Sequence, residues 1–420
     1  MNKNLSRREF LAASGVAAAS FAMPKNVFAA PQTSKLRIGV IGCGGRGTGA
    51  AVNACKAAEG VEIVALGDLF MDRVTGCANY IQEQAKDSFN VKQDHMFSGF
   101  DAYTKVLQTD CDMVILATPP AFRPFHLQAA IKAGKNVFME KPVAVDGAGI
   151  KIVYEASDLA KEKGLAIVAG TQRRHQNSYR ETLARIHDGA IGDVVAMSCY
   201  WNQGGLWMHP RQDSWSDAEW QLRNWLYFTW LSGDHICEQH IHNIDVCLWA
   251  KQKMPVKAIG HGGRQVRTDP AYGHIFDHFA IEYTFDDGTI LHSYCRQQDG
   301  TVANVSERIV GTKGTSNGDG RIAGENAFRF DGDNPNPYVN EHTDLIASIR
   351  SGNPLNEGRQ VANSTLAAIM GRLAAYTGDE ITPEEALSTK STMPSGLTLA
   401  SSLEVEAVAV PGKTKLVDFS

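Results

Sequence analysis

The chain has 420 residues, of which 43% are hydrophobic and 21% are charged, and its formal net charge is -5. Because one domain typically has roughly 100–200 residues, this length predicts two domains. The slightly acidic balance gives no electrostatic reason to bind nucleic acid or an anionic membrane, which sets both aside as partners.

The first thirty residues differ from the rest. Residues 6–11 (SRREFL) precede an alanine-rich apolar stretch that ends at Met23, and residues 27–29 (VFA) offer a small-residue cleavage site. This pattern predicts a twin-arginine signal peptide over residues 1–30, recognition by the Tat export machinery and a periplasmic mature protein. The alternative is an N-terminal helix with two chance arginines. The stretch is too short and too alanine-rich for a good membrane span, so no membrane insertion is expected.

Residues 31–165 alternate short β-branched runs with helical stretches, which is typical of parallel βαβ units. The expected strands are 36–41, 62–68, 113–117 and 136–140, and the expected helices are 48–58, 71–87, 124–133 and 147–163. We expect an α/β fold whose N-terminal part is a Rossmann dinucleotide-binding domain.

Residues 166–420 have a different pattern. Strand-like runs at 194–201, 256–260, 277–285, 289–296 and 308–311 are separated by turns, and helices are expected at 344–351 and 362–376. This predicts a C-terminal α+β domain with a large, mainly antiparallel open sheet. Its open face makes a homo-oligomer the expected assembly.

A glycine-rich turn, residues 42–47 (GCGGRG), lies between the first strand and the first helix. Gly42, Gly44 and Gly47 match a G-x-G-x-x-G turn, whose backbone approaches a pyrophosphate at a helix N-terminus. Asp68 ends the next strand about twenty residues further on, where a carboxylate accepts hydrogen bonds from an adenosine ribose.

An acid at Asp68 repels a 2'-phosphate, which favours NAD over NADP. Arg46 and Arg73 weaken this preference, because either side chain would attract such a phosphate. Residues 117–120 (ATPP) follow the fourth strand, at the carboxyl edge where open α/β sheets bind ligands.

Four motifs together resemble the Gfo/Idh/MocA family of glucose-fructose oxidoreductase and inositol dehydrogenase. They are residues 41–47 (IGCGGRG), 117–120 (ATPP) with His126, 140–142 (EKP) and 311–314 (GTKG). The resemblance spans nearly the whole mature chain and implies sugar chemistry without specifying a substrate.

The resemblance implies that Lys141 lies beside the nicotinamide and the substrate hydroxyl. Pro142 would lie in a tight turn, for which a cis bond is one option, and Glu140 would orient the lysine. A lysine near a nicotinamide cation should have its ammonium form disfavoured, which helps proton exchange near neutral pH. The residues assigned to the cofactor site are Gly42, Gly44, Gly45, Arg46, Gly47, Asp68, Thr118, Pro119, His126, Glu140 and Lys141.

A histidine-rich segment, residues 233–245, is expected to be one helix. Glu238, His242 and Asp245 would share a face, with His235 beside them. The family has an Asp and a His four residues apart on such a helix. His242 matches that His, whereas Glu238 replaces the Asp. We assign His242 as the proton acceptor that works with Lys141, and include Glu238 among the catalytic residues.

Two other interpretations of this segment stay open. His235, Glu238 and His242 would be metal ligands if they met around one ion. Alternatively, the histidines are structural and their neighbours satisfy them. We adopt the substrate site and assign no metal.

Six of the seven tryptophans lie within residues 201–230, a segment that is also rich in polar residues. Aromatic faces beside hydrogen-bonding groups suit a sugar. Trp225 is therefore assigned to substrate binding with Glu238 and His242, although most of these tryptophans would pack an insertion or a subunit contact. Arg173, His175 and Tyr179, which follow a strand, are further substrate-binding candidates.

These features favour an exported NAD-dependent oxidoreductase that acts on a hydroxyl or keto group of a carbohydrate or glycoside. An exported enzyme has little free NAD to draw on, so the cofactor would be tightly bound. The alternative is an NAD-dependent glycosidase or lyase that oxidises the sugar transiently, eliminates across the acidified C–H bond and reduces the product. A non-catalytic sugar-binding protein is a third possibility.

Overall fold

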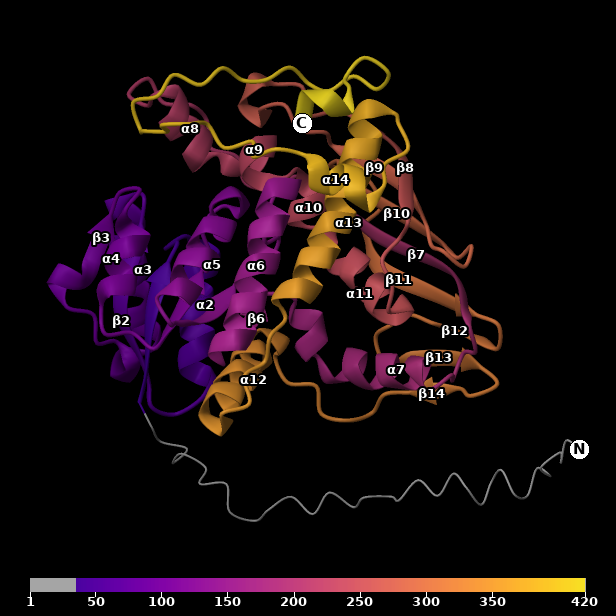
Figure 1. Cartoon of the computed structure of the whole chain (residues 1–420), viewed down its shortest axis with the longest axis horizontal. Coiled ribbons are helices and arrows are strands. Elements are labelled where there is room, and N and C mark those ends of the chain that lie inside the picture. Colours follow the sequence, from indigo (N-terminus) through magenta and orange to yellow (C-terminus); the bar gives the residue numbers. More distant parts are fainter. Residues whose placement is uncertain (1–34, 420) are drawn as a thin grey trace, which may run out of the picture.

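Residues 36–41 (LRIGVI) form the central strand of a six-stranded parallel sheet in the computed structural model, which describes residues 35–419 (Figure 1). The predicted signal peptide lies outside the described residues. The strand order is β3-β2-β1-β4-β5-β6. The strands are β1 (Leu36–Ile41), β2 (Val61–Asp68), β3 (Met96–Ser98), β4 (Met113–Leu116), β5 (Asn136–Met139) and β6 (Ile167–Ala169).

Helices cover both faces of this sheet, which explains why its strands are continuous apolar runs. The helices are α2 (Gly45–Ala57), α3 (Met71–Gln84), α4 (Ala102–Gln108), α5 (Arg123–Lys132) and α6 (Gly147–Lys163). Asp146 caps α6 by accepting a hydrogen bond from the backbone N–H of Gly149 at 2.7 Å. The arrangement confirms the predicted Rossmann fold. Its sixth strand lies past residue 165, where the sequence had placed the domain boundary.

The C-terminal domain contains an eight-stranded sheet with the order β14-β13-β12-β11-β7-β10-β9-β8, in which only β7 and β10 pair in parallel. This confirms the predicted mainly antiparallel sheet. The strands are β7 (Val194–Gln203), β8 (Lys257–Gly263), β9 (His278–Thr284), β10 (Ile290–Gln297), β11 (Asn304–Gly311), β12 (Gly314–Ser316), β13 (Arg321–Gly324) and β14 (Phe328–Arg329).

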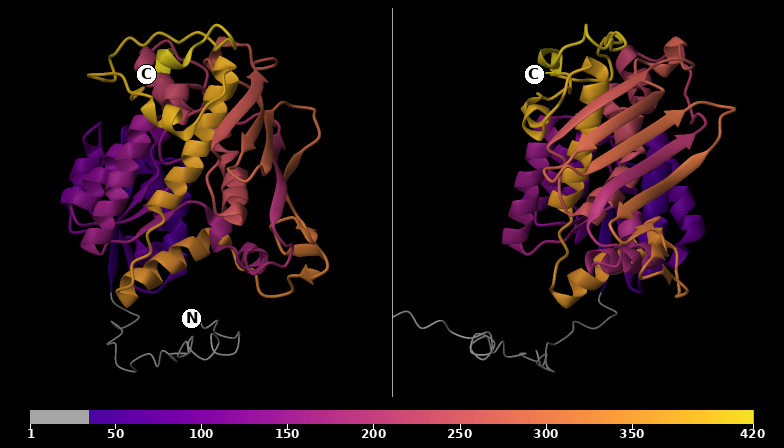
Figure 2. Two further views of the ribbon diagram at one scale, coloured as in Figure 1. Left: turned by 45° about the vertical axis from the view of Figure 1, so that its right-hand side comes forward. Right: turned by 90° about the vertical axis from the view of Figure 1, so that its right-hand side faces the viewer.

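Helices pack on one face of the large sheet, whereas no helix of residues 35–419 covers its other face (Figure 2). The helices of this domain are α7 (Asn177–His187), α8 (Asp217–Arg223), α9 (Thr229–Ser232), α10 (His235–Glu238), α11 (Ile241–Lys251), α12 (Pro337–Ser351), α13 (Gly358–Thr377) and α14 (Pro383–Ser388). Helix α13 is buried almost all round because it runs between the two domains (Figure 1).

The predicted continuous helix over residues 233–245 is wrong. It is interrupted between α10 and α11, where the side chain of Gln239 bonds to Gln203 at 2.7 Å and Gln297 at 3.0 Å. His240 contacts Ser293 at 2.7 Å. These tertiary hydrogen bonds hold the two residues against the sheet and interrupt the helical register. Glu238 and His242 therefore lie on different helices.

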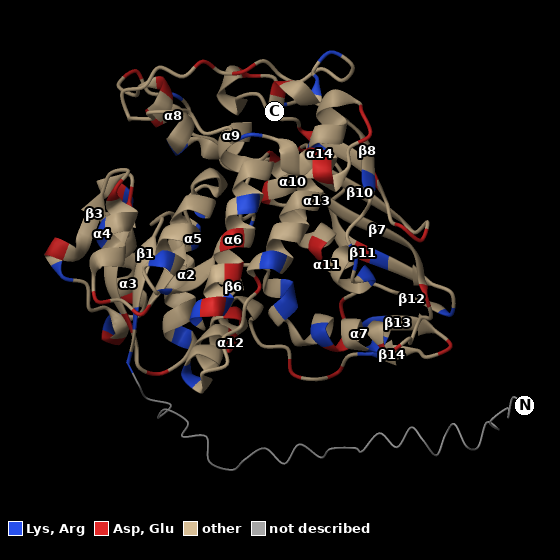
Figure 3. Cartoon of the chain, viewed as in Figure 1, with Lys and Arg blue, Asp and Glu red and all other residues tan. Residues whose placement is uncertain are grey.

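Charged residues of both signs are interspersed over the molecule in the view of Figure 3. Among residues 35–419, no helix has the length and apolar character needed to span a membrane.

Candidate active site

The glycine-rich turn after β1 leaves no room for a side chain at Gly42 or at Gly47. Gly42 has a φ of +97°, and a Cβ on Gly47 would lie 1.9 Å from the carbonyl oxygen of Gly42. A Cβ on Gly42 would lie 2.5 Å from the backbone of Thr118. The turn therefore packs tightly against the end of β4, and the N-terminus of α2 borders the adjacent pocket.

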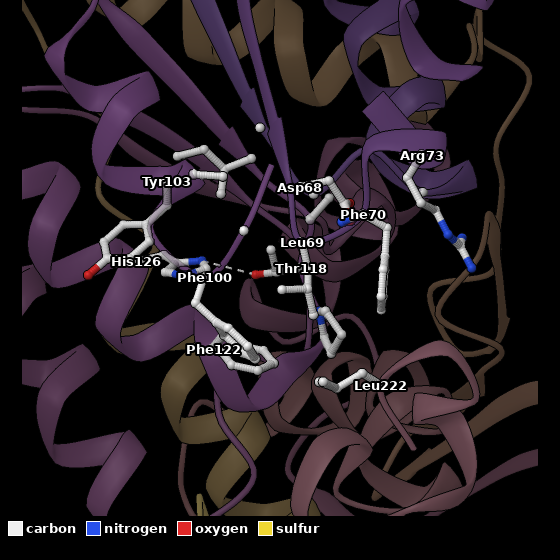
Figure 4. A pocket seen from close by; sticks show the side chains of 18 of the residues that line it. Asp68, Leu69, Phe70, Arg73, Phe100, Tyr103, Thr118, Phe122, His126 and Leu222 are labelled. Atoms are coloured by element: carbon white, nitrogen blue, oxygen red, sulfur yellow. Dashed lines mark hydrogen bonds between the residues drawn. The ribbon is translucent and has the colours of Figure 1, made fainter. Parts of the chain in front are cut away.

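Asp68 is at the end of β2 and lines this pocket (Figure 4). Its carboxylate accepts hydrogen bonds from the backbone N–H groups of Cys43 at 2.7 Å and Phe70 at 3.0 Å. Burial raises the pKa of Asp68, although the two N–H groups oppose this shift. Each carboxylate oxygen keeps a free lone pair, so the group can still accept hydrogen bonds from a ribose.

The opposite wall of the pocket contains Thr118 and His126, whose hydroxyl and Nδ1 are 3.2 Å apart (Figure 4). Tyr103 stacks on His126 with 4.4 Å between ring centroids. Burial, followed by the charge of Arg123, lowers the pKa of His126 to about 3, so its imidazole is neutral. The pocket has a volume of about 740 Å³ including its open mouth. The glycine turn, the helix N-terminus and Asp68 thus fit the phosphates and adenosine of a dinucleotide.

Lys141 is brought next to Glu238 at the carboxyl end of β5. Its Nζ donates a hydrogen bond to the backbone carbonyl of Glu238 and lies 3.4 Å from the Oε1 of that residue. The Lys141–Pro142 peptide bond is cis. Arg123 donates a hydrogen bond at 2.6 Å to the carbonyl of Pro142 and so supports the turn. Arg123 belongs to no recognisable motif, so its role could not be predicted from the sequence.

Glu140 contacts Arg46. The Nε of Arg46 lies 2.6 Å from Glu140 Oε1, and its Nη2 lies 2.8 Å from Glu341 Oε1 on α12. Both carboxylates are buried, and burial, followed by repulsion from Glu140, raises the pKa of Glu341 well above its ordinary value. Arg46 therefore ties the glycine turn to the C-terminal part of the chain. Glu341 lies about three hundred residues after Arg46 in the sequence. No motif spacing could therefore have predicted that the two residues pair.

His242 is only 7% exposed and stacks on Trp201 with 5.7 Å between ring centroids. Burial, followed by the charges of Lys141, Arg173 and Arg46, lowers the pKa of His242 well below its ordinary value. The imidazole is therefore neutral, and it can accept a hydrogen bond from a substrate hydroxyl.

Arg173 is held beside His242 by Glu307 on β11, which was also missed. Glu307 pairs with Arg173 and accepts hydrogen bonds from Tyr179 at 3.1 Å and Asn243 at 2.6 Å. Burial raises the pKa of Glu307 to about 7, although Arg173 opposes this shift. Tyr179 is thus a buried partner of Glu307. Because successive side chains of a strand point to opposite faces of the sheet, the pattern of β11 could have predicted that Glu307 lies on the inner face.

Other predicted residues lie elsewhere. His175 is buried between Asp344 and Glu357, at 2.6 Å and 3.2 Å. Trp225 and Asp68 line the same pocket. The residues that line this pocket include neither Lys141 nor His242.

His235, one of the ligands in the alternative metal-site interpretation, is fully buried, and its Nδ1 lies 3.0 Å from Asp234 Oδ1. Asp245 forms a bidentate ion pair with Arg174. The Nε and Nη2 atoms of Arg174 donate hydrogen bonds to its two carboxylate oxygens at 2.8 and 2.9 Å. Within residues 35–419, no group of three His, Cys, Asp or Glu side chains is arranged to hold a metal ion.

Comparisons with known proteins agree with this geometry. The chain is 27% identical over 267 residues to 2,7-anhydro-N-acetylneuraminate hydratase of Escherichia coli (strain K12), covering 62% of this chain and 64% of that protein. It is 31% identical over 166 residues to inositol 2-dehydrogenase 4 of Saccharopolyspora erythraea, covering 39% of this chain and 45% of that protein. The chain therefore matches less than two thirds of the length of these relatives.

The structure of scyllo-inositol dehydrogenase from Lactobacillus casei, with bound NAD(H) and scyllo-inositol, has the same fold. It is 19% identical, with a TM-score of 0.63 over 84% of this chain and 100% of that one. Residues 36–171 match the model "Oxidoreductase family, NAD-binding Rossmann fold", and residues 179–317 match the model "GFO/IDH/MocA C-terminal domain". With both domains matched in order, the chain belongs to the Gfo/Idh/MocA family.

Proposed function

We propose that this protein is an NAD-dependent oxidoreductase that acts on a hydroxyl or keto group of a sugar or glycoside. The observation that carries the proposal is the contact of Lys141 with Glu238, together with the effect of the Lys141 charge on the pKa of the buried His242, in a protein whose N-terminal domain has a pocket that fits a dinucleotide. Two segments that are 97 residues apart supply these groups, and a purely structural site would not require a lysine and a neutral histidine together. The inositol dehydrogenases among the similar proteins support a polyhydroxylated substrate.

When bound, NAD supplies the hydride acceptor for oxidation of a hydroxyl-bearing carbon, or the donor for the reverse reaction. Lys141, held by Glu238, donates a hydrogen bond that fixes the substrate oxygen. His242 is neutral and accepts the hydroxyl proton as the carbonyl forms. The stacked Trp201 and the low exposure of His242 exclude water from the imidazole.

Lys141→Met tests this assignment. Because the methionine can neither orient the substrate oxygen nor share its proton, we expect turnover to fall by at least about a hundredfold. Bound NAD should remain, since the adenosine pocket is unchanged. The measurement is absorbance of bound reduced nicotinamide after adding a panel of sugars and glycosides. Lys132→Met, which removes an exposed lysine, is the control. Full turnover in Lys141→Met would reject the assignment.

A second candidate function is supported by Glu238. Its Oε2 is buried and has no hydrogen-bond partner among the described residues, so it is available as an acid or base. One similar protein is named a hydratase, which fits chemistry beyond simple oxidation. In this candidate the sugar is oxidised, eliminates across its acidified C–H bond and is reduced again. Release of a sugar from a glycoside without added NAD, and without net nicotinamide reduction, would favour it over a dehydrogenase.

The proposal includes export by the twin-arginine pathway to the periplasm, supported by residues 6–11 (SRREFL). Cell fractionation tests this, because mature protein found only in the cytosol would reject it. We also propose a homo-oligomer formed through the helix-free face of the large sheet. Tyr294 on β10 and Ile259 on β8 are 37% and 43% exposed, the two neighbours of Tyr294 along its strand are buried, and Tyr294 stacks on Tyr200. Light scattering on the purified protein tests the assembly.

A further inference from the structure

The break between α10 and α11 frees a backbone carbonyl that lies beside Lys141. In a continuous helix, the N–H of His242 would bond to the carbonyl of Glu238, four residues earlier. It bonds instead to the carbonyl of Gln239, at 3.3 Å. The carbonyl of Glu238 accepts a hydrogen bond from the Nζ of Lys141. The contact that holds this lysine therefore depends on the break in the helix.

The break begins with a widened turn that the helix would not form by itself. The N–H of His240 bonds at 3.1 Å to the carbonyl of His235, five residues earlier, where an α-helix would span four. The buried imidazole of His240 contacts Ser293 of β10 at 2.7 Å. Because a five-residue turn is rare in helices, contacts from outside the helix must hold it.

The main external contact is with the side chain of Gln239, which two other glutamines hold. Gln203 is the last residue of β7, Gln297 is the last residue of β10, and the two are register partners in the parallel pairing of these strands. Their Nε2 atoms donate to Gln239 Oε1 at 2.7 and 3.0 Å. We call these three residues the glutamine clamp. One oxygen accepts both hydrogen bonds, so the clamp needs an acceptor at position 239.

Arg267, in the loop between β8 and β9, sets the direction of the hydrogen bonds in the clamp. A guanidinium carries donors only, and the Nη1 of Arg267 donates to Gln297 Oε1. Gln297 must therefore present its Nε2 to Gln239. Arg267 is only 5% exposed, and its Nη2 donates to the carbonyl of Phe276 at 2.7 Å. A buried cation thus fixes which end of each amide faces the next.

We propose that Gln239 is a positioning residue for the reaction, because the glutamine clamp keeps the helix broken and so gives the carbonyl of Glu238 to Lys141. The inference rests on the proposed function, which gives Lys141 its role. Without the break, the N–H of His242 would take this carbonyl. Lys141 would then keep only the carboxylate of Glu238, whose Oε1 lies 3.4 Å from Nζ. A flexible lysine with one loose contact would no longer hold a substrate oxygen in place.

Two substitutions at position 239 separate the clamp from a general loss of packing. Gln239→Met removes the acceptor and is a good helix former, so it lets α10 and α11 join. Gln239→Glu keeps an acceptor for both glutamines. Gln298→Met is the matched control, because Gln298 follows Gln297 and its side chain bonds to Asp277 at 3.2 Å.

The first measurement is the rate at which a sugar from the panel reduces bound nicotinamide. We expect Gln239→Met to lower kcat at least about tenfold, with the KM of the sugar changed less than about threefold. Gln239→Glu should be at least about threefold faster than Gln239→Met. Gln298→Met should match the wild type. Equal kcat in Gln239→Met and Gln298→Met would overturn the proposal, and so would equal losses in Gln239→Met and Gln239→Glu.

The second measurement needs no substrate. Crystal structures of the wild type and Gln239→Met should differ at the carbonyl of Glu238, which should accept from Lys141 in the wild type and from the N–H of His242 in the variant. An unchanged contact with Lys141 in Gln239→Met would overturn the proposal. If Gln239→Met does not fold, Gln203→Met, which removes one donor of the clamp, is judged by the same two measurements.

The two measurements also separate this inference from the proposed function. If no sugar reduces bound nicotinamide in the wild type, the proposed function fails. The crystal structures then still decide whether the glutamine clamp positions Lys141.

Discussion

At the residue scale, His175 shows how a side chain assigned to substrate binding serves the fold. It joins the end of the nucleotide domain to α12 and α13 through Asp344 and Glu357. Burial alone would lower its pKa, but hydrogen bonds to the two carboxylates raise the pKa to about 9. The histidine is therefore protonated in the folded protein at neutral pH and forms a buried ionic bridge between segments distant in sequence.

This bridge predicts a pH dependence of stability. Because the folded-state pKa lies above the ordinary value of about 6.5, the stabilisation is complete below that pH and is lost as pH rises through about 9. Protonation of His175 contributes up to about 3 kcal/mol to the free energy of unfolding. The His175→Gln variant should have a lower free energy of unfolding than the wild type at pH 6. Its free energy of unfolding should also decrease less between pH 6.5 and 9.5. Urea unfolding at each pH measures both effects. His278→Gln, an exposed histidine beside Asp277, is the control. Parallel pH profiles of wild type and His175→Gln would contradict the assignment.

At the scale of the elements, the glycine turn and the start of α2 differ in how closely other atoms approach their backbone. Gly47 and Gly49 are two residues apart, yet a Cβ on Gly47 would lie 1.9 Å from a carbonyl oxygen, whereas nothing lies within 4 Å of one on Gly49. The same substitution should therefore have opposite effects.

Gly47→Ala should displace the turn, cost about 1–3 kcal/mol of stability and abolish NAD binding. Gly49→Ala should keep NAD binding and gain about 0.5–1 kcal/mol, because alanine favours a helix more than glycine does. Calorimetry of the melting transition and titration of NAD into apoprotein measure both effects. Equal NAD affinity in the two variants would show that the turn tolerates a side chain and would contradict the close packing.

At the scale of the whole molecule, the two domains do not have separate cores. One apolar cluster includes Ile41 and Leu127 of the nucleotide domain together with Ile236 and Leu366 of the C-terminal domain. A second places Leu345 and Ile346 of α12 against β1 and α2. We therefore expect a single cooperative unfolding transition.

Leu345→Ala tests this coupling, because Leu345 is fully buried although it lies in the last quarter of the chain. The cavity should cost about 2–5 kcal/mol and lower the midpoint of the single transition. Val417→Ala, at a residue 72% exposed, should change stability by less than about 0.5 kcal/mol. Two separate calorimetric transitions, with only the later one shifted by Leu345→Ala, would show that the domains unfold independently.

The Rossmann fold, the mainly antiparallel second sheet, the glycine turn and the strand-end positions of Asp68 and Lys141 could all be predicted from the sequence. These follow from local rules: apolar periodicity, a turn that admits only glycine, and the shared carboxyl edge of parallel strands. The family resemblance added the expected roles of Lys141 and His242, which stay predictions, and the structure shows that the charge of Lys141 contributes to lowering the pKa of His242.

The pairings between distant segments depend on how the folded chain packs and could not be predicted. Arg46 with Glu341, Arg173 with Glu307 and Arg223 with Phe70 each join residues more than a hundred positions apart, and no spacing rule links them. Tertiary hydrogen bonds also interrupted the histidine-rich helix at Gln239. The physical reason is that a buried charge needs a partner from whichever element packs against it, and packing is a property of the whole chain.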